Sequence, residues 1–452
     1  MVILDLPWRD PLTAFAPLAG EEGAVLLDAA TAGDDDRGRH AAVCARPAAV
    51  VSHRLGDGDP FAALAALLPP QRPAVPGLPP FQTGVVALLG YELGGAVGRL
   101  PAPLPDDLGL PDLWAARYDT LALFDRRQRR AWVVSAEAEA AAAAAADGLA
   151  ATPPPPPDPT PVPWQAERQR HAHEAAVARV IAFIGAGVIF QANITQRFLG
   201  TLPPGLSRFD LYRRLRAASP APFAAFLNLG DGAAVASASP ERFLRLTADG
   251  RVETRPIKGT RPRRADPAAD AAEARALQDS AKDRAENLMI VDLLRNDIGR
   301  VCEIGSVRVP VLCGLESFAS VHHLVSVVEG RLAPGRTAVD LLRACFPGGS
   351  VTGAPKVRAM EIIAELEPAR RGPYCGSIAW LGADGGMDSS IIIRTLCIGT
   401  SGRVAAQAGG GIVADSDPAA EHEESLTKAA ALLRALDGDG AGGRHPQETP
   451  LP

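Results

Sequence analysis

Lys258 stands alone in a stretch rich in turn-forming residues, TRPIKGTRPR, which runs from Thr254 to Arg263. Gly259 follows it, and a glycine lets the backbone approach a ligand closely because it has no Cβ. A lysine in this setting is either an ordinary surface charge or an amine held for nucleophilic attack. Glu241, in ASASPERFL, is by itself consistent with a surface acid.

Two expected helices each carry acids at helical spacing. Asp283 and Glu286 are three residues apart, as are Glu421 and Glu424, and Lys428 lies four residues further on. Residues at this spacing share a helix face. Two such acidic faces would repel each other unless a hard cation lay between them, and Mg²⁺ takes carboxylate oxygens. Taken alone, the spacing is more typical of solvated helix faces.

Two glycine-rich segments are expected to be loops: PGGSVTGAPK (Pro347–Lys356) and AGGGIVADSDP (Ala408–Pro418). Glycines let backbone N–H groups approach an anion, although neither segment has the spacing of a known phosphate loop, and each alone is more often a turn. Arg394, in the apolar strand expected over SSIIIRTL, needs an anionic partner if it is buried, which a structural ion pair would also supply. A lone histidine such as His323 is usually structural.

The bulk composition excludes several classes of function. The 452 residues are too many for one ordinary core, so two domains or one composite are expected. A net charge of −6 without a long basic run argues against nucleic acid as a main partner. No run of about 18 apolar residues occurs, so no membrane span is expected. The six cysteines form no C-x-x-C pair and the start lacks a signal-peptide pattern, which favours a cytoplasmic location.

The candidate residues are expected to lie on or between predicted strands and helices. GAVLLDAA, GVVALLG and TLALFDRRQRRAWVVSA alternate or are apolar, as strands do. Residues 224–257 and 376–399 are also predicted to be strands linked by turns, whereas 167–187, 266–301 and 418–438 have helical periodicity. The two types do not alternate strictly, so an α+β architecture is expected.

Composition also predicts the domain boundaries. We expect an N-terminal region over residues 1–135, an Ala/Pro-rich linker over 136–164, a catalytic domain over 165–437 and a disordered tail over 438–452. In the linker, the alanines are expected to end a helix and the prolines to follow as an extended segment.

Nine segments occur together and in one order between about residues 187 and 430. They are IFQANITQRF, SPERF, TRPIKGTRPR, AENLMIVDLLRNDIGRV, PGGSVTGAPK, CGSIAWL, IRTL, GGGIVADSDP and EHEESLTKA. Together they closely resemble the chorismate-utilising enzymes, and the N-terminal third resembles that family more weakly. The resemblance implies a layered αββα sandwich with two large mixed or antiparallel sheets, which the N-terminal region completes.

Two positions discriminate within the family. Anthranilate and isochorismate synthases carry alanine at the place of Lys258, and isochorismate and salicylate synthases carry at the place of Gln191 a lysine that activates water. The resemblance therefore implies replacement of the C4 hydroxyl of chorismate by an amine, which gives 4-amino-4-deoxychorismate for 4-aminobenzoate and folate synthesis. The alternatives are anthranilate formation and a non-catalytic chorismate-binding regulator.

The resemblance implies a role for each candidate residue. Lys258 would attack the ring, Glu241 would protonate the leaving hydroxyl, and His323 would lie near the departing group. The residues implied to hold the substrate are Gly259, Thr260, Thr352, Arg394, Gly409, Gly410, Gly411 and Lys428. Mg²⁺ is implied, with Glu286 and Glu424 as direct ligands and with Asp283 and Glu421 holding ligand waters.

A partner and a regulatory property are also implied. No nucleophile elbow of a glutaminase occurs in the sequence, so ammonia is expected from a separate glutamine amidotransferase. Asp28 and Ala29 replace the Glu-Ser pair with which anthranilate synthases sense tryptophan, so feedback inhibition by tryptophan is not expected. Trp380 stands where those synthases usually have tyrosine, and the change is expected to loosen contact with the enolpyruvyl side chain of the substrate.

Overall fold

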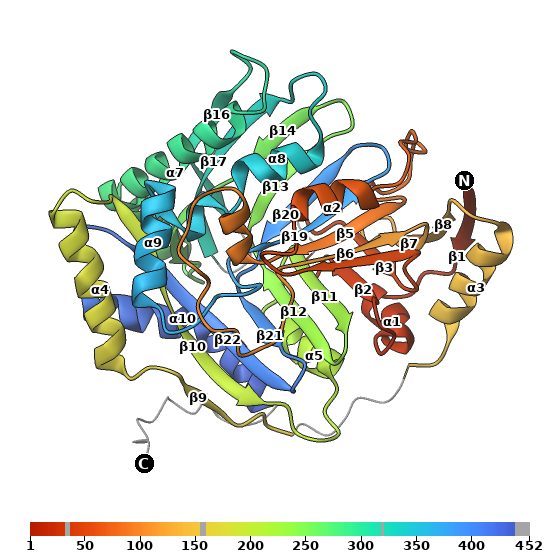
Figure 1. Cartoon of the computed structure of the whole chain (residues 1–452), viewed down its shortest axis with the longest axis horizontal. Coiled ribbons are helices and arrows are strands. Elements are labelled where there is room, and N and C mark those ends of the chain that lie inside the picture. Colours follow the sequence, from red (N-terminus) through yellow and green to blue (C-terminus); the bar gives the residue numbers. More distant parts are fainter. Residues whose placement is uncertain (32–36, 154–159, 318–320, 439–452) are drawn as a thin grey trace.

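The computed structural model describes residues 1–31, 37–153, 160–317 and 321–438 (Figure 1). In these residues the strands form two sheets, one of 12 strands and one of 10. Every strand pairing in the described part of the chain is antiparallel. The predicted α+β class with two large sheets is confirmed.

The first sheet joins strands from both ends of the chain. Its order is β1-β8-β7-β3-β2-β11-β12-β21-β22-β10-β18, with β9 on β10. The N-terminal region completes this sheet, as predicted, because β2 pairs with β11. Its strands are β1 (Val2–Leu6), β2 (Val25–Asp28), β3 (His40–Cys44), β7 (Thr120–Asp125), β8 (Arg130–Ser135), β9 (Trp164–Ala166), β10 (Gln191–Thr201), β11 (Phe223–Gly230), β12 (Ala233–Ser239), β18 (Gly353–Ala354), β21 (Thr395–Ile398) and β22 (Arg403–Ile412).

The second sheet is built in the same way. Its order is β15-β17-β14-β13-β20-β19-β5-β6-β4, with β16 along the other side of β17, and β5 from the N-terminal region pairs with β19. Its strands are β4 (Ala49–His53), β5 (Gly84–Leu89), β6 (Leu113–Tyr118), β13 (Arg242–Leu246), β14 (Arg251–Thr254), β15 (Ile257–Pro262), β16 (Arg308–Ser317), β17 (Val321–Arg331), β19 (Ser377–Gly382) and β20 (Met387–Ile391).

Helices cover the outer face of each sheet. Those against the first sheet are α1 (Pro11–Phe15), α3 (Glu139–Ala150), α5 (Arg208–Ala218) and α10 (Pro418–Asp437), and those against the second are α2 (Pro60–Leu67), α6 (Pro267–Gln278), α7 (Ala281–Gly299) and α8 (Ala338–Cys345). Two more, α4 (Arg170–Gly185) and α9 (Lys356–Leu366), pack on β10, and the short 3₁₀ turns are η1 (Ala16–Leu18), η2 (Tyr91–Ala96) and η3 (Gly349–Val351). The predicted αββα layering is confirmed.

Alternation along the strands explains why the sheets stack. In β5, Val85, Ala87 and Leu89 join the core under α2, whereas Val86 and Leu88 join the core between the sheets. Successive side chains of a strand point to opposite faces, so a strand that is apolar throughout is buried on both sides. The layer between the sheets fixes their relative position, and with it the strands that carry the site.

Local signals place the two acid-bearing helices. Asp417 accepts a hydrogen bond from Ala420 N at 2.9 Å and Pro418 occupies the first turn of α10, which ends before Gly438 at φ +79°. Ser280 caps α7 in the same way, and its hydroxyl accepts from Asp283 N at 3.2 Å. The helical stretch predicted over residues 266–301 is therefore two helices, because Ser280 starts a new one.

The predicted linker lies partly outside the described residues, at 154–159, and so does nearly all of the predicted tail, at 439–452. Within the linker, α3 ends at Ala150, where the alanine run was expected to end a helix. Val162 is buried, and β9 starts at Trp164. The four domain boundaries stay predictions.

Candidate active site

Lys258 lies on β15 at an irregularity of the strand. The register between β15 and β17 shifts between Lys258 and Thr260, and Gly259 between them has φ +75°. A Cβ on Gly259 would come within 2.9 Å of Asp283 Cγ. Glycine is therefore required both by the left-handed backbone and by the close approach of α7.

The amine of Lys258 lies against β22. A Cβ added to Gly411 would be 3.5 Å from Lys258 Nζ and 2.2 Å from Gln191 Nε2. Burial lowers the pKa of the lysine from its ordinary value, and Glu286 opposes this effect. A larger fraction of the amine is neutral than at the surface, and only the neutral amine is a nucleophile.

Glu241 lies between β12 and β13 and is 8% exposed. Burial raises the pKa of its carboxyl, while a hydrogen bond from Ser350 and the charge of Lys258 act in the opposite direction. A carboxyl that retains its proton beside an amine can serve as a general acid. Ser350 lies within the quoted PGGSVTGAPK segment, but no spacing in the sequence connects it to Glu241.

The acids of α7 and α10 lie close enough to affect each other. Burial raises the pKa of Glu286, and the charge of Glu421 raises it further. Burial likewise raises the pKa of Glu421, which accepts a hydrogen bond from Ser416 at 2.6 Å. Burial acts in the same direction on Glu424, but an ion pair with Lys428 at 2.7 Å leaves the pKa of Glu424 lowered.

These acids suit a magnesium ion by chemistry, since carboxylate oxygens are its usual protein ligands. Asp283 also pairs with Arg261 at 3.4 Å. Among the residues that the structure describes, no three acidic, histidine or cysteine side chains converge closely enough to hold a metal ion. The carboxylates are chemically suited to Mg²⁺. In this arrangement, however, Arg261 and Lys428 neutralise part of their negative charge by pairing with Asp283 and Glu424.

The predicted loop over Gly409, Gly410 and Gly411 is wrong. These residues belong to β22 and pair with Thr195, Ile194 and Asn193 of β10. A Cβ on Gly410 would lie 3.1 Å from Glu421 Oε2 and 3.4 Å from Lys428 Nζ. Because glycine has no side chain, the side chains of α10 can approach the strand closely at this position. Lys428 Nζ also donates to Gly409 O at 3.0 Å.

The strand predicted to contain Arg394 is also wrong. β20 ends at Ile391 and β21 begins at Thr395, and Arg394 lies between them with φ +53°. Within the described part of the chain its guanidinium has no hydrogen bond or ion pair, and burial lowers its pKa. A half-buried guanidinium without an anion is suited to a ligand carboxylate.

His323 and Thr260 lie opposite each other on β17 and β15. Thr260 Oγ1 is 2.9 Å from His323 Nδ1, and Gly259 O is 3.4 Å from the same nitrogen. Burial lowers the pKa of His323.

Thr352 is fully buried, and its hydroxyl donates to Gly348 O at 3.1 Å. This hydrogen bond stabilises the turn that contains both residues.

Gln191 is fully buried, and neither its Oε1 nor its Nε2 has a hydrogen-bond partner among the described residues. Leaving a buried amide without partners is costly unless a ligand supplies them. Because Gln191 and Lys258 lie on the same side of Gly411, the missing partner would come from a molecule beside the amine.

Trp380 lies elsewhere. It stacks on Phe81, with ring centroids 5.3 Å apart, and lines a cavity between the two sheets together with Asp28. β19 directs this side chain toward the layer between the sheets, so its contact with the substrate stays a prediction. The structure thus brings together Lys258, Glu241, Gln191 and the acids of α7 and α10, with His323 and Arg394 beside them.

Comparison with known proteins identifies the family of this chain. The sequence profile of the chorismate binding enzymes matches residues 25–434. Aminodeoxychorismate synthase component 1 of Klebsiella aerogenes is 42% identical over 456 residues, which cover 96% of this chain and 99% of that protein. Anthranilate synthase component 1 of Streptomyces coelicolor is 42% identical over 448 residues, 94% of this chain and 86% of that protein.

The fold has a counterpart among solved structures. Anthranilate synthase component I from Streptococcus pneumoniae superposes with a TM-score of 0.79 at 32% identity, covering 89% of this chain and 94% of that chain. In the described residues, no helix has the length and apolar character needed to cross a membrane.

Proposed function

The chain belongs to the chorismate binding enzymes, and we propose that it converts chorismate and ammonia to 4-amino-4-deoxychorismate. Relatives named aminodeoxychorismate synthase component 1 are 42–45% identical to this chain and relatives named anthranilate synthase component 1 are 42% identical, so overall similarity favours the first activity only slightly. Lys258 supports the first activity. It is an amine of lowered pKa at a position where anthranilate synthases have alanine.

In the first step the neutral Lys258 amine attacks C2 of the chorismate ring. The ring double bonds shift, the C4–O bond breaks, and Glu241 gives its proton to the leaving hydroxyl, which departs as water. Burial raises the pKa of Glu241, which supports its role as a proton donor. A covalent adduct with the lysine results, and Glu241 is left as a carboxylate.

In the second step ammonia attacks C4 of this adduct. The double bonds shift back and the C2–N bond breaks, so Lys258 is released. Glu241 takes a proton from the attacking nitrogen, which restores its acid form. The amine ends at the carbon that lost the hydroxyl, and Gln191, which is not basic, gives water no comparable activation.

Charged and polar groups around the amine would hold the substrate. Arg394, Lys428 and the backbone of Gly409–Gly411 are proposed to bind its carboxylates, with His323 beside the departing group. Bound Mg²⁺, held by Glu286 and Glu424 directly and by Asp283 and Glu421 through water, would neutralise the ring carboxylate and polarise it as a Lewis acid.

A separate glutamine amidotransferase is the proposed source of ammonia, and the product would feed the synthesis of 4-aminobenzoate and folate in the cytoplasm. The words "component 1" in the relatives' names support a two-component enzyme.

We also propose that tryptophan does not inhibit the enzyme, because the carboxylate of Asp28 is already bound by Tyr212, Arg126 and Arg216.

Product identification tests this function. The purified chain is incubated with chorismate, Mg²⁺ and an ammonium salt, and the products are separated with fluorescence and mass detection. We expect 4-amino-4-deoxychorismate, which added lyase converts to 4-aminobenzoate, and no product when glutamine replaces ammonium. Anthranilate would place the chain with the other relatives and show that Lys258 does not direct the position of amination.

A further inference from the structure

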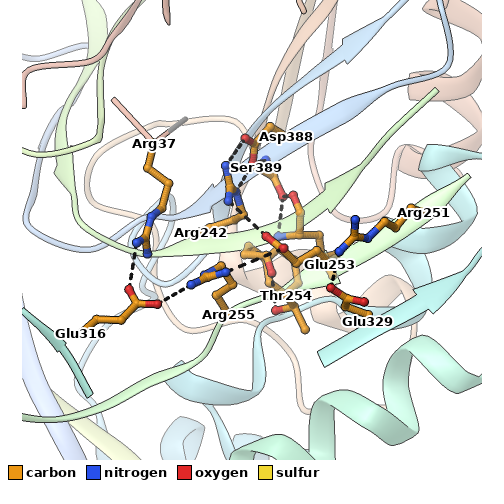
Figure 2. A network of polar contacts seen from close by, with 12 residues as sticks. Arg37, Arg242, Arg251, Glu253, Thr254, Arg255, Glu316, Glu329, Asp388 and Ser389 are labelled. Atoms are coloured by element: carbon orange, nitrogen blue, oxygen red, sulfur yellow. Dashed lines mark hydrogen bonds and ion pairs between the residues drawn. The ribbon is translucent and has the colours of Figure 1, made fainter. Parts of the chain in front are cut away.

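A network of ion pairs crosses the second sheet (Figure 2). Asp388 holds Arg242 through two bonds of 2.9 Å, Arg242 reaches Glu253 at 3.3 Å, and Glu253 is 3.8 Å from Arg255. Arg255 then pairs with Glu316. The network therefore includes an acid, Glu316, that the proposed reaction does not use.

Glu316 is also held from the N-terminal region. Arg37 Nη2 donates to Glu316 Oε2 at 2.8 Å, while Arg255 binds the other carboxylate oxygen. Figure 2 shows the two guanidinium groups approaching Glu316 from different sides. The three side chains are only 15–25% exposed, so the carboxylate is fixed and poorly solvated.

The register of the sheet places Glu316 opposite His323. Glu316 on β16 pairs with His323 on β17, which in turn pairs with Thr260 on β15. Directly opposite residues of antiparallel strands point to the same face, with Cβ atoms about 5 Å apart. An acid, an imidazole and a hydroxyl thus form a row across three strands.

The groups that face His323 come from every neighbouring segment. β15 contributes Gly259 O and the Thr260 hydroxyl, and β16 contributes Glu316. Arg394 and Arg37 are the nearby cations. Burial lowers the pKa of His323; Arg394 and Arg37 act in the same direction, and Glu316 opposes them.

We propose that Glu316 is a positioning residue for His323, and that Arg37 and Arg255 hold it in place and offset its charge. Glu316, opposite His323 in the sheet, favours the protonated imidazole through its charge, while the two arginines hold the carboxylate and reduce that effect. The contribution of His323 to catalysis rests on the proposed function, whereas the electrostatic coupling between these residues does not.

Titration of the histidines by NMR tests the coupling without substrate. The His323 signal is assigned by its loss in a His323→Asn variant, and is then followed with pH in Glu316→Gln and Arg37→Gln. We expect its midpoint to move to lower pH in Glu316→Gln, which loses an anion, and to higher pH in Arg37→Gln, which exposes that anion.

Arg251→Gln is the matched control. Arg251 pairs with Glu329 on the same sheet, so this variant also loses an arginine–glutamate pair, but Glu329 is six residues from His323 along β17. Its His323 signal should titrate as in the wild type. A His323 signal that both test substitutions leave unmoved, including one that never titrates, overturns the proposal.

Kinetics separate positioning from structural support. In Glu316→Gln we expect kcat to fall about tenfold, with KM for chorismate changed less than about twofold and the pH profile moved in the direction of the titration. Equal loss in Arg251→Gln would mean that only sheet stability is involved. If the titration moves but no variant makes 4-amino-4-deoxychorismate, the coupling stands and the proposed function fails.

Discussion

Asp28 and Glu241 are both buried acids, but their surroundings differ. The Asp28 cluster consists of Asp28, Arg126, Tyr212 and Arg216. Its acid is fully enclosed, and both carboxylate oxygens are bound, one by Arg126 and the other by Arg216 and by Tyr212 at 2.9 Å. A buried charge with this many partners is stable without any ligand.

The Lys258 site, by which we mean Lys258, Glu241, Gln191 and Arg394, is incompletely satisfied. The Gln191 amide and the Arg394 guanidinium have no partner in the described part of the chain, and burial displaces the pKa values of Lys258 and Glu241 toward their neutral forms. Groups left in this condition cost stability and are typical of sites that a ligand completes. The complete hydrogen bonding of the Asp28 cluster indicates a structural role, whereas the groups of the Lys258 site that are unpaired among the described residues indicate a role in ligand binding and catalysis.

The largest expected effect is at Lys258. Replacing it with alanine removes the proposed nucleophile, so turnover with chorismate and ammonium should fall by about a thousandfold or more. The thermal midpoint should stay close to that of the wild type, because the lysine is buried and has no ion pair within 4 Å among the described residues. Turnover at wild-type rates would remove the covalent mechanism while leaving the family assignment intact.

Asp28→Asn should lower the stability of the protein and leave its turnover unchanged. It leaves Arg126 and Arg216 without their shared anion, and breaking a buried ion pair costs about 3 kcal/mol in free energy of unfolding. Urea unfolding measures this loss, and kcat should not change. The control is Asp10→Asn, because Asp10 also pairs with Arg126 but is 46% exposed, and this change should cost less than about 1 kcal/mol. A large fall in kcat for Asp28→Asn would contradict the distinction.

His173 is a buried polar residue without hydrogen-bond partners in the described part of the chain, and it lies outside the Lys258 site. On α4 it is 1% exposed, neither ring nitrogen has a partner among the described residues, and its ring is 5.4 Å from that of His422. Burial lowers the pKa of His173 to about 4, and the unfolded chain keeps the ordinary value of 6.5. Protons therefore favour unfolding as the pH falls.

The stability contributed by neutral His173 is complete above pH 6.5 and is lost as the pH falls toward about 4. His173→Leu should reduce the acid loss of unfolding free energy by an amount on the order of 2 kcal/mol, measured by urea unfolding at several pH values. His171→Leu, at an exposed position on the same helix, is the control. An unchanged acid profile in His173→Leu would show that burial does not suppress the charge of this imidazole.

The smallest expected effect is at Arg394. Arg394→Lys keeps the positive charge but loses the planar fork that binds a carboxylate through two hydrogen bonds. KM for chorismate should rise about tenfold, which corresponds to about 1.4 kcal/mol, with little change in kcat. A fall in kcat with constant KM would show that Arg394 acts on the transition state and not on substrate binding.

The sequence predicted the elements that depend on local signals. The hairpin of β7 and β8 follows from alternation around a polar turn, and α10 from Asp417, Pro418 and Gly438 at its ends. The grouping of Lys258 with Glu241 and with the acids of two helices came from the order of the motifs, which reflects a shared fold and not a local pattern.

The errors have a common physical origin in tertiary contacts. Glycines have low strand propensity, so pairing with β10 is what makes Gly409–Gly411 a strand. The apolar run before Arg394 does not reveal the positive φ that interrupts it. Ser350 and Glu316 act through neighbours that are distant in sequence, so no spacing could have identified them.

The covalent lysine mechanism is tested directly by the intact mass of the protein after incubation with chorismate and Mg²⁺ without ammonium. An amine that attacks C2 with loss of the C4 hydroxyl should increase the mass by that of chorismate less one water. Peptide mapping should then place the addition on Lys258, and adding ammonium should remove it. Formation of 4-amino-4-deoxychorismate by a protein that never carries this addition would contradict nucleophilic attack by Lys258.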